Sequence, residues 1–411
     1  MSDHVWVSRL TPSRLATSRV LVASLALGST AWAFAEEERT PYYIGLTQSF
    51  THDSNVFRTA NNPIADTTSG TGIVAGIDQQ ISRQRLYADG TVQVNRHRNV
   101  DQLDNTSYSL NAGLDWSTVE FLSGTLRYTT ARNQANFGLV GVPAATGNNL
   151  ETTQQFLASA RYGLTSDLAF DVSAEHRSLK YSDEASANRN YTQNIGGAGL
   201  RWGKPGILTF GVGGRLTKGT TPDYQPTDPK EDKLTRKDLD FTAEWVPTGF
   251  STLRARISVT RETHTIATAS DVDGQTGSLE WAYKPTAKLS FNTTLSRDTG
   301  TETTFSIPSA EGEAVKRVDD NRITNTARLG IKYEVTSKIM TGVNARYSKG
   351  SGGSTTGDDK VNTYGLMASY EATRNFNLGC NYSHESRSAN GFGLESYSVN
   401  LVGCTAQLLL K

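Results

Sequence analysis

Long runs of alternating apolar and polar side chains constrain the fold of this chain more than any other feature. In residues 289–297, 253–260 and 107–116, apolar side chains occupy one phase of the alternation and Ser, Thr, Asn, Asp or Arg the other. A period of two places the two sets on opposite faces of a β-strand, one against an apolar medium and one against a polar medium. The runs last about 11 to 14 residues, whereas strands of globular proteins usually span roughly 3–10 and a tilted membrane-crossing strand needs about 9–11. We therefore predict an all-β transmembrane, antiparallel up-and-down β-barrel.

The connections between these runs alternate between short and long. We count about 18 strands, the first over roughly 42–52 and the last over roughly 396–410. Short turns are expected near Ser82, Val119, Thr165, Pro205, Thr248, Thr286, Thr336 and Thr373. Longer polar loops are expected near 53–69, 98–105, 134–150, 182–190, 219–235, 265–275, 299–321, 350–360 and 387–395. This asymmetry is typical of outer-membrane barrels, with short periplasmic turns and long extracellular loops.

The N-terminus has the layout of a secretory signal peptide. Arg9, Arg14 and Arg19 precede the apolar run 20–27, and small residues at 31, 33 and 35 form cleavage patterns. We expect residues 1–35 to be removed and 36–411 to form the barrel. A cytosolic amphipathic N-terminus is the alternative. The apolar run is shorter than the ~20 residues that a spanning helix requires.

Large aromatic residues recur just before the predicted short turns. Their rings belong at a membrane–water boundary, so we predict an aromatic girdle at the periplasmic end. Its members are Trp116, Tyr162, Trp202, Trp245, Trp281, Tyr283, Tyr333 and Tyr370. Several begin an aromatic-x-x-Thr repeat that recurs about every 40 residues, a period that a soluble β-propeller also shows. A propeller blade would hold four short strands in each period, whereas here each period holds two long ones.

The polar phase of the strands carries many charges. On the inward face we place Arg85, Arg127, Arg161, Arg177, Arg215, Arg254, Arg256, Lys332, Arg346, Asp89, Asp115, Asp171, Glu175, Asp240, Glu244, Glu280 and Glu334. Buried charges must be paired or hydrated, and a barrel of this size is wide enough to hold water. The lining would then be either a conduit whose charges select solutes or a salt-bridged lumen that only stiffens the barrel.

Both cysteines fall in the last predicted hairpin, which centres near Phe392. In a simple hairpin Cys380 and Cys404 lie directly opposite each other, and the periplasm is oxidising, so we predict a cross-strand disulfide. A β-bulge near Val402, where the apolar phase changes, would shift the register and leave two free thiols.

Composition and motifs argue against other classes of protein. Lys and Arg total 41 against 41 Asp and Glu, whereas a nucleic-acid-binding domain is usually basic. The sequence holds no G-x-S-x-G, H-E-x-x-H or C-x-x-C motif, and we predict no cofactor and no enzymatic activity. A barrel enzyme would need a triad that converges only in space. Asp53, Asn55 and Asp66 have the oxygen ligands that Ca²⁺ prefers, but we read them as solvated loop residues and predict no metal site.

Several segments resemble a known family. Residues 49–58 read Ser-Phe-Thr-His-Asp-Ser-Asn-Val-Phe-Arg, and further motifs occur at 72–87 and 103–126. They resemble the outer-membrane barrels encoded in exopolysaccharide biosynthesis operons (the EpsL type), within the group named putative β-barrel porins. The resemblance is densest over about 42–130 and continues more loosely to the C-terminus. It implies a role in polysaccharide export at the cell outer membrane.

These observations favour a porin-like outer-membrane conduit for an exopolysaccharide. The expected partners are outer-membrane lipid, a polysaccharide or oligosaccharide solute and periplasmic components of an export system, with no nucleic acid. A non-conducting assembly or docking protein is the second hypothesis. The third is a barrel enzyme acting on polysaccharide or lipid.

Overall fold

The strands of this chain close into one antiparallel barrel. A computed structural model describes residues 40–137, 147–163, 167–224, 231–266, 271–299, 323–351, 358–390 and 395–410. In that part of the chain 18 strands form a single sheet, every strand pairs with its neighbours in sequence, and β1 pairs with β18 to close the wall. The predicted fold class is confirmed. The expected signal peptide over 1–35 and the expected turn at Thr165 lie outside the described residues.

The strands are long, as the alternation predicted. The first nine are β1 (Tyr42–Asp53), β2 (Asp66–Ile81), β3 (Gln84–His97), β4 (Asn105–Ser117), β5 (Leu122–Gln134), β6 (Leu150–Tyr162), β7 (Leu168–Tyr181), β8 (Tyr191–Lys204) and β9 (Leu208–Thr221). The others are β10 (Asp232–Thr248), β11 (Ser251–His264), β12 (Val272–Tyr283), β13 (Leu289–Thr299), β14 (Ile323–Glu334), β15 (Ile339–Ser351), β16 (Asp358–Glu371), β17 (Phe376–Asn390) and β18 (Tyr397–Leu410).

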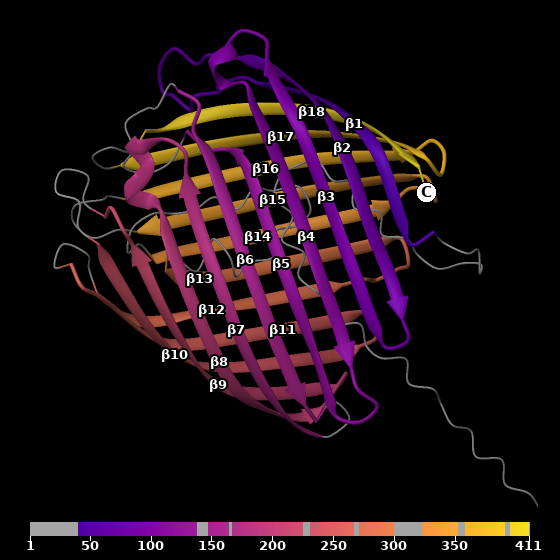
Figure 1. Cartoon of the computed structure of the whole chain (residues 1–411), viewed down its shortest axis with the longest axis vertical. Helices are drawn as coiled ribbons and strands as arrows, with labels where there is room; N and C mark the ends of the chain where they lie inside the picture. The colour runs from indigo at the N-terminus through magenta and orange to yellow at the C-terminus, as the bar shows by residue number, and fades with distance from the viewer. Residues whose placement is uncertain are drawn as a thin grey trace, which may run out of the picture.

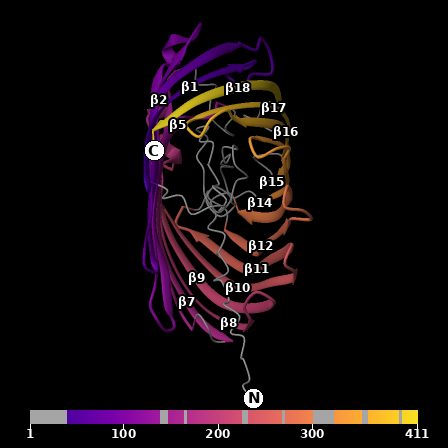
Figure 2. The ribbon, with the colours of Figure 1, turned by 90° about the vertical axis from the view of Figure 1, so that its right-hand side faces the viewer.

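The two ends of the barrel differ. At one end, here called the turn end, short turns join the strands, for example β2 to β3 at Ser82, which has a φ of 55°. At the other, the loop end, the connections are long, and two of them contain the short 3₁₀ helices η1 (Asp101–Leu103) and η2 (Glu184–Arg189). Figures 1 and 2 show β1–β9 forming one wall and β10–β17 the wall that faces it.

The two faces of the wall have opposite chemistry. On the outer face Ile44, Leu46 and Ile257 are 55%, 60% and 59% exposed. On the inner face Thr47 and Ser258 are buried. A continuous apolar outer surface of this kind is stable against lipid and not against water. No helix in the described part of the chain is long and apolar enough to cross a bilayer.

Strand register is regular, with one local exception. The pairing of β10 with β11 shifts between Trp245 and Thr248, where Pro247 has no N–H to donate to the ladder. No shift occurs near Val402, because β17 and β18 pair continuously from Phe376–Leu408 to Arg387–Tyr397. The apolar residues before Val402 therefore face inward, and Tyr397 and Val399 are buried there.

Inward tyrosines fill space that neighbouring glycines leave open. A Cβ added to Gly113 would lie 2.4 Å from the ring of Tyr87, and one added to Gly76 would lie 2.5 Å from the ring of Tyr43. Only glycine allows such close approach of a ring to the backbone. Gly76, Tyr87 and Gly113 lie in the segments that carry the family resemblance, so these motifs serve packing of the barrel wall.

Candidate functional site: the charged lumen

Register places every predicted lumen charge on the inward face. The set comprises Arg85, Arg127, Arg161, Arg177, Arg215, Arg254, Arg256, Lys332, Arg346, Asp89, Asp115, Asp171, Glu175, Asp240, Glu244, Glu280 and Glu334. They share their phase with the buried polar residues of the same strands and alternate with exposed apolar ones. The lumen is therefore lined by charge around most of its circumference.

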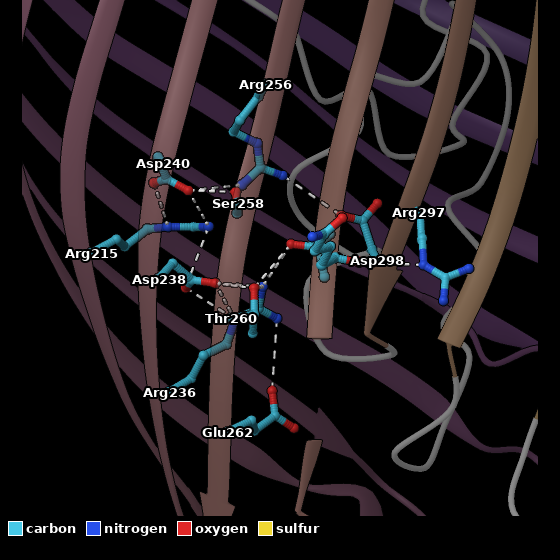
Figure 3. A network of polar contacts seen from close by, with 12 residues as sticks. Arg215, Arg236, Asp238, Asp240, Arg256, Ser258, Thr260, Glu262, Arg297 and Asp298 are labelled. Atoms are coloured by element: carbon cyan, nitrogen blue, oxygen red, sulfur yellow. Dashed lines mark hydrogen bonds and ion pairs between the residues drawn. The ribbon is translucent and has the colours of Figure 1, made fainter. Parts of the chain in front are cut away.

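The densest group of charges spans β9 to β11 near the loop end (Figure 3). Asp238 lies at its centre and accepts hydrogen bonds from Arg236 (2.9 Å) and Thr260 (2.6 Å). Arg215 lies 3.4 Å from the same carboxylate, and Glu262 lies 3.7 Å from Arg236. The side chains of Asp238 and Arg236 are 0% and 3% exposed. Charges this deeply buried are tolerated because each one contacts an opposite charge.

A second carboxylate, Asp240, extends this group toward the turn end. It lies 3.4 Å from Arg215 and 3.9 Å from Arg256, and it accepts a hydrogen bond from Ser258 at 2.5 Å. Arg256 also lies 3.6 Å from Asp298 on β13. Cations and carboxylates thus alternate from β9 through β10 to β11, and Arg256 reaches across β12 to the carboxylate on β13.

Closer to the turn end the ion pairs are more open to the lumen. Asp171 lies between Arg161 (2.6 Å) and Arg201 (3.3 Å), and Arg254 lies 3.1 Å from Glu244. The arginines here are 21%, 34% and 37% exposed. These guanidinium groups are the cations best placed to meet a solute in the lumen.

The wall formed by the first strands is less charged. Arg85 of β3 pairs with Asp78 at 2.6 Å and lies 3.8 Å from Asp115. Asn111 links two further predicted residues, since it donates to Asp89 (2.8 Å) and accepts from Arg127 (3.0 Å). On the adjoining inner faces of β1 and β18 the buried polar residues are uncharged: Thr47, Ser49, Thr405 and Gln407.

The remaining predicted charges also face other inward groups. Arg254 and Glu280 stand opposite each other across β11 and β12, and Glu175 contacts Arg177. Arg346 stands opposite Arg328 across β14 and β15. Lys332 and Glu334 face inward near the turn end of β14.

Sequence reasoning missed several inward charges, most of them toward the loop end. The omitted residues are Asp78, Arg201, Asp232, Arg236, Asp238, Glu262, His264, Asp298, Arg328, Asp359, Glu385 and Arg387. Asp232, Asp359 and Arg387 lie on strands that extend into the expected loops 219–235, 350–360 and 387–395. Strand phase alone would have found Arg236 and Asp238, because they continue the even-numbered face of Asp240 and Glu244.

The loops after β1 and β3 form an ordered cap with its own small apolar core. Phe57, Val100 and Leu103 are buried together, and Phe137 meets Phe57 edge-on at 5.1 Å between ring centroids. The side chain of Asn55 donates to the backbone carbonyls of Thr59 and of Ser398 on β18. The segment 49–58, which carries the family resemblance, therefore builds the first loop.

The candidate calcium ligands are used within this cap. Asp53 pairs with Arg58 at 2.7 Å, and the carboxylate of Asp66 accepts backbone N–H groups of Asn99 and Val100. Among the described residues no group of three or more His, Cys, Asp or Glu is arranged to hold a metal ion. The oxygens that could have bound Ca²⁺ instead fix the loop conformation.

A neighbouring loop carboxylate is held ionised. The backbone N–H of His97 donates to Asp104 at 2.7 Å, and Arg96 lies 2.8 Å from it. These donors, the backbone N–H first, hold the pKa of Asp104 below its ordinary value.

The predicted girdle residues all point outward at the turn end of their strands. They are Trp116, Tyr162, Trp202, Trp245, Trp281, Tyr283, Tyr333 and Tyr370. Trp281 and Tyr283 stack at 5.5 Å, and Phe291 continues the stack at 6.1 Å. Phe121 and Phe210 also contact girdle residues, and the sequence reading omitted both because they begin strands or turns.

Cys380 and Cys404 are joined by a disulfide. They stand directly opposite each other in the β17–β18 pairing, and their Cα atoms are 4.1 Å apart. Both lie on the outer face, in phase with Leu378 and Leu408. The bond therefore ties the last hairpin from its lipid-facing side.

One inward histidine contacts two carboxylates. His264 has Nδ1 2.6 Å from Asp232 and Nε2 3.3 Å from Glu262. Both ring nitrogens are engaged, so neither can take a proton from a nucleophile while this arrangement holds. The trio is therefore better suited to holding β10 and β11 together than to base catalysis.

Comparison with known protein families supports a general type of barrel and no particular solute. The family described as Putative beta-barrel porin 2 matches residues 276–408, from β12 into β18. This chain forms a porin-like barrel. The segments that resemble EpsL-type barrels, over 42–130, lie outside the matched range, so the link to exopolysaccharide stays a prediction. A comparison with curated proteins gave no match.

The porin-like barrel also resembles solved outer-membrane proteins. OpdK of Pseudomonas aeruginosa is 11% identical, the alignment covers 90% of this chain and 98% of that chain, and the TM-score is 0.49. The glucuronate complex of OccK2 (OpdF) from the same organism gives the same four values. OccAB4 of Acinetobacter baumannii is 10% identical, with 90% and 98% coverage and a TM-score of 0.45.

Proposed function

We propose that this porin-like barrel is an outer-membrane conduit through which an exopolysaccharide leaves the cell. In this proposal a signal peptide over residues 1–35 directs the protein itself out of the cytoplasm. The observation that carries the proposal is the ion-paired inner wall beneath an outer face that carries many large exposed apolar side chains. Paired charges keep the lumen hydrated while its net charge stays small. A hydrated lumen of small net charge suits a bulky solute that is rich in hydroxyl groups. The resemblance of the first strands to EpsL-type barrels supplies the solute class.

Single-channel recording tests the conduit. The mature chain, refolded and inserted in planar bilayers, should give large stable conductance steps that acidic or neutral oligosaccharides block. Folding is checked in the same preparation by the shift of the unheated barrel on a denaturing gel. A barrel that is folded but silent would contradict the proposal.

A deletion strain tests the solute. Loss of the protein should reduce the exopolysaccharide recovered outside the cell and leave polymer in the periplasm. Normal secretion from that strain would rule out export as the role of the conduit.

The ordered loop cap favours a second candidate function, docking of a partner. Asn55 ties the first loop to β18, and the apolar cluster of Phe57, Val100 and Leu103 fixes its shape. A preformed surface of this kind loses little entropy on binding. Co-purification of a periplasmic or surface component with a non-conducting barrel would favour docking over conduction.

A further inference from the structure

The outer wall of the barrel contains a groove in its loop-end half. It lies over β6 to β9 and has a volume of about 460 Å³, inside the roughly 300–1,000 Å³ range of small-molecule sites. Its apolar lining includes Phe156, Ala174, Gly196 and Leu216. Elsewhere on the outer face large apolar side chains stand out from the wall, so a hollow here requires a local cause.

Small residues at matched positions cause the groove. Ala174, Gly196 and Leu216 form one lateral row across β7, β8 and β9. A Cβ added to Gly196 would meet no atom within 4 Å, and the same holds for Gly214 two residues from Leu216. Phe156 and Leu216, 46% and 41% exposed, form the two sides. The open space is therefore bounded by apolar walls and is wide enough for a hydrocarbon chain.

The next lateral row toward the loop end carries three polar side chains beside Phe156. Phe156, His176, Asn194 and Lys218 face one another in turn from β6 to β9, and His176 Nδ1 lies 2.8 Å from Asn194 Oδ1. Asn194 is eight residues from the girdle residue Trp202, which places this row roughly 20 Å above the girdle in an apolar band about 25 Å tall. The groove is thus apolar below and carries hydrogen-bonding and cationic groups at its upper edge.

Basic residues ring the outer face of the whole barrel toward the loop end. Those on the groove strands and on the adjacent β5 are Arg132, Lys180 and Lys218. The others lie on more distant strands and on β10, outside the groove: Arg96, Lys233, Lys237, Arg261, Arg297, Lys349 and Lys360. On the outer face of the described strands the acidic residues are Asp273 and Asp358. Lys237 and Arg261 stand directly opposite each other on β10 and β11, and Arg261 lies 3.7 Å from Asp273 on β12.

We propose that this groove binds one phosphorylated glycolipid from the leaflet at the loop end. An acyl chain would lie between Phe156 and Leu216, and a headgroup phosphate would contact the Lys218 ammonium and the amide N–H groups of Asn194, whose Oδ1 accepts from His176. Charge complementarity selects an anionic headgroup, and the apolar floor selects an acylated one. The inference rests on the proposed outer-membrane location, and it concerns the outer wall, so it is independent of what the lumen conducts.

Native mass spectrometry of the mature barrel in neutral detergent tests the groove. The probes are bisphosphorylated lipid A, dephosphorylated lipid A and phosphatidylglycerol. The variant Gly196→Leu/Lys218→Gln fills the floor and removes the cation, and Ala112→Leu/Lys360→Gln makes the same two changes elsewhere on the outer face. We expect the first variant to lower the affinity for bisphosphorylated lipid A at least about tenfold, and the second to leave it unchanged.

Two kinds of result would overturn the proposal. Equal binding of dephosphorylated lipid A, or of phosphatidylglycerol, would overturn the assignment to a phosphorylated glycolipid. Unchanged affinity in the groove variant would overturn the site itself. If that double variant does not fold, Lys218→Gln alone serves, because this side chain is exposed and should still lower the affinity. Conductance recorded on the same samples should be the same for all variants, so failure of the conduit and failure of the lipid site can be told apart.

Discussion

At the scale of single residues, the contribution of each ion pair on the inner wall to the stability of the barrel depends on how deeply the pair is buried. Asp238 is fully buried between Arg215 and Arg236, whereas the Asp78 side chain, paired with Arg85, is 58% exposed. Removing one partner of a buried pair leaves an uncompensated charge, while an exposed pair is largely replaced by water.

This contrast gives a prediction for two matched substitutions. Asp238→Ala should destabilise the barrel by about 3–5 kcal/mol, and Asp78→Ala by no more than about 1 kcal/mol. Urea unfolding of the refolded protein in detergent, followed by tryptophan fluorescence, measures both. Equal effects of the two substitutions would contradict the assignment of Asp238 to a buried network.

At the scale of elements, period-two alternation was sufficient to predict the strands. The predicted first and last strands, 42–52 and 396–410, agree closely with Tyr42–Asp53 and Tyr397–Leu410. In the structure each of the predicted lumen charges shares the phase of the buried polar residues of its strand. Phase could not say which charges pair, because that depends on the register between strands and on how far each strand extends at the loop end. Asp232, for instance, is the first residue of β10 but falls within the expected loop 219–235.

The last hairpin offers a test at this scale. The disulfide between Cys380 and Cys404 closes a loop with a sequence separation of 24, which corresponds to about 3 kcal/mol of lost entropy in the unfolded chain. The double substitution Cys380→Ser/Cys404→Ser should lower the unfolding midpoint accordingly, and reduction of the wild-type protein should have the same effect. Titration of free thiols before reduction should find none; two reactive thiols would show that the bond does not form.

The first loop offers a second test. Asn55→Ala removes the amide that ties this loop to Thr59 and Ser398, so the segment 54–65 should exchange its amide hydrogens faster while the strands stay protected. Asn61→Ala, an exposed position in the same loop, is the control. Equal exchange in the two variants would mean that Asn55 does not organise the cap.

At the scale of the whole molecule, the lumen is balanced in charge while the outer face near the loop end is basic. Arg161, Arg201 and Arg254 are partly open to the lumen and lie beside Asp171 and Glu244. Conversion of all three arginines to Gln would leave those carboxylates in excess and should make the pore more selective for cations.

The reversal potential in a salt gradient measures this selectivity. The control changes Lys237, Lys349 and Lys360 to Gln, which removes the same charge from the outer wall. That control should leave the reversal potential unchanged, because the wall and screening by salt separate those charges from the lumen. A shift of equal size in both variants would show that selectivity is not set by the inner lining.

Closure of the wall between β1 and β18 has a consequence for the order of events during assembly. The pairs from Ile44–Leu410 to Asp53–Leu401 join the two most distant strands in sequence, so they form only after the whole wall has been made. Until then β1 presents a long row of unsatisfied backbone groups that would pair with any available strand edge. Because the disulfide joins β17 to β18, the element that docks onto β1 is a cross-linked hairpin and not a single loose strand.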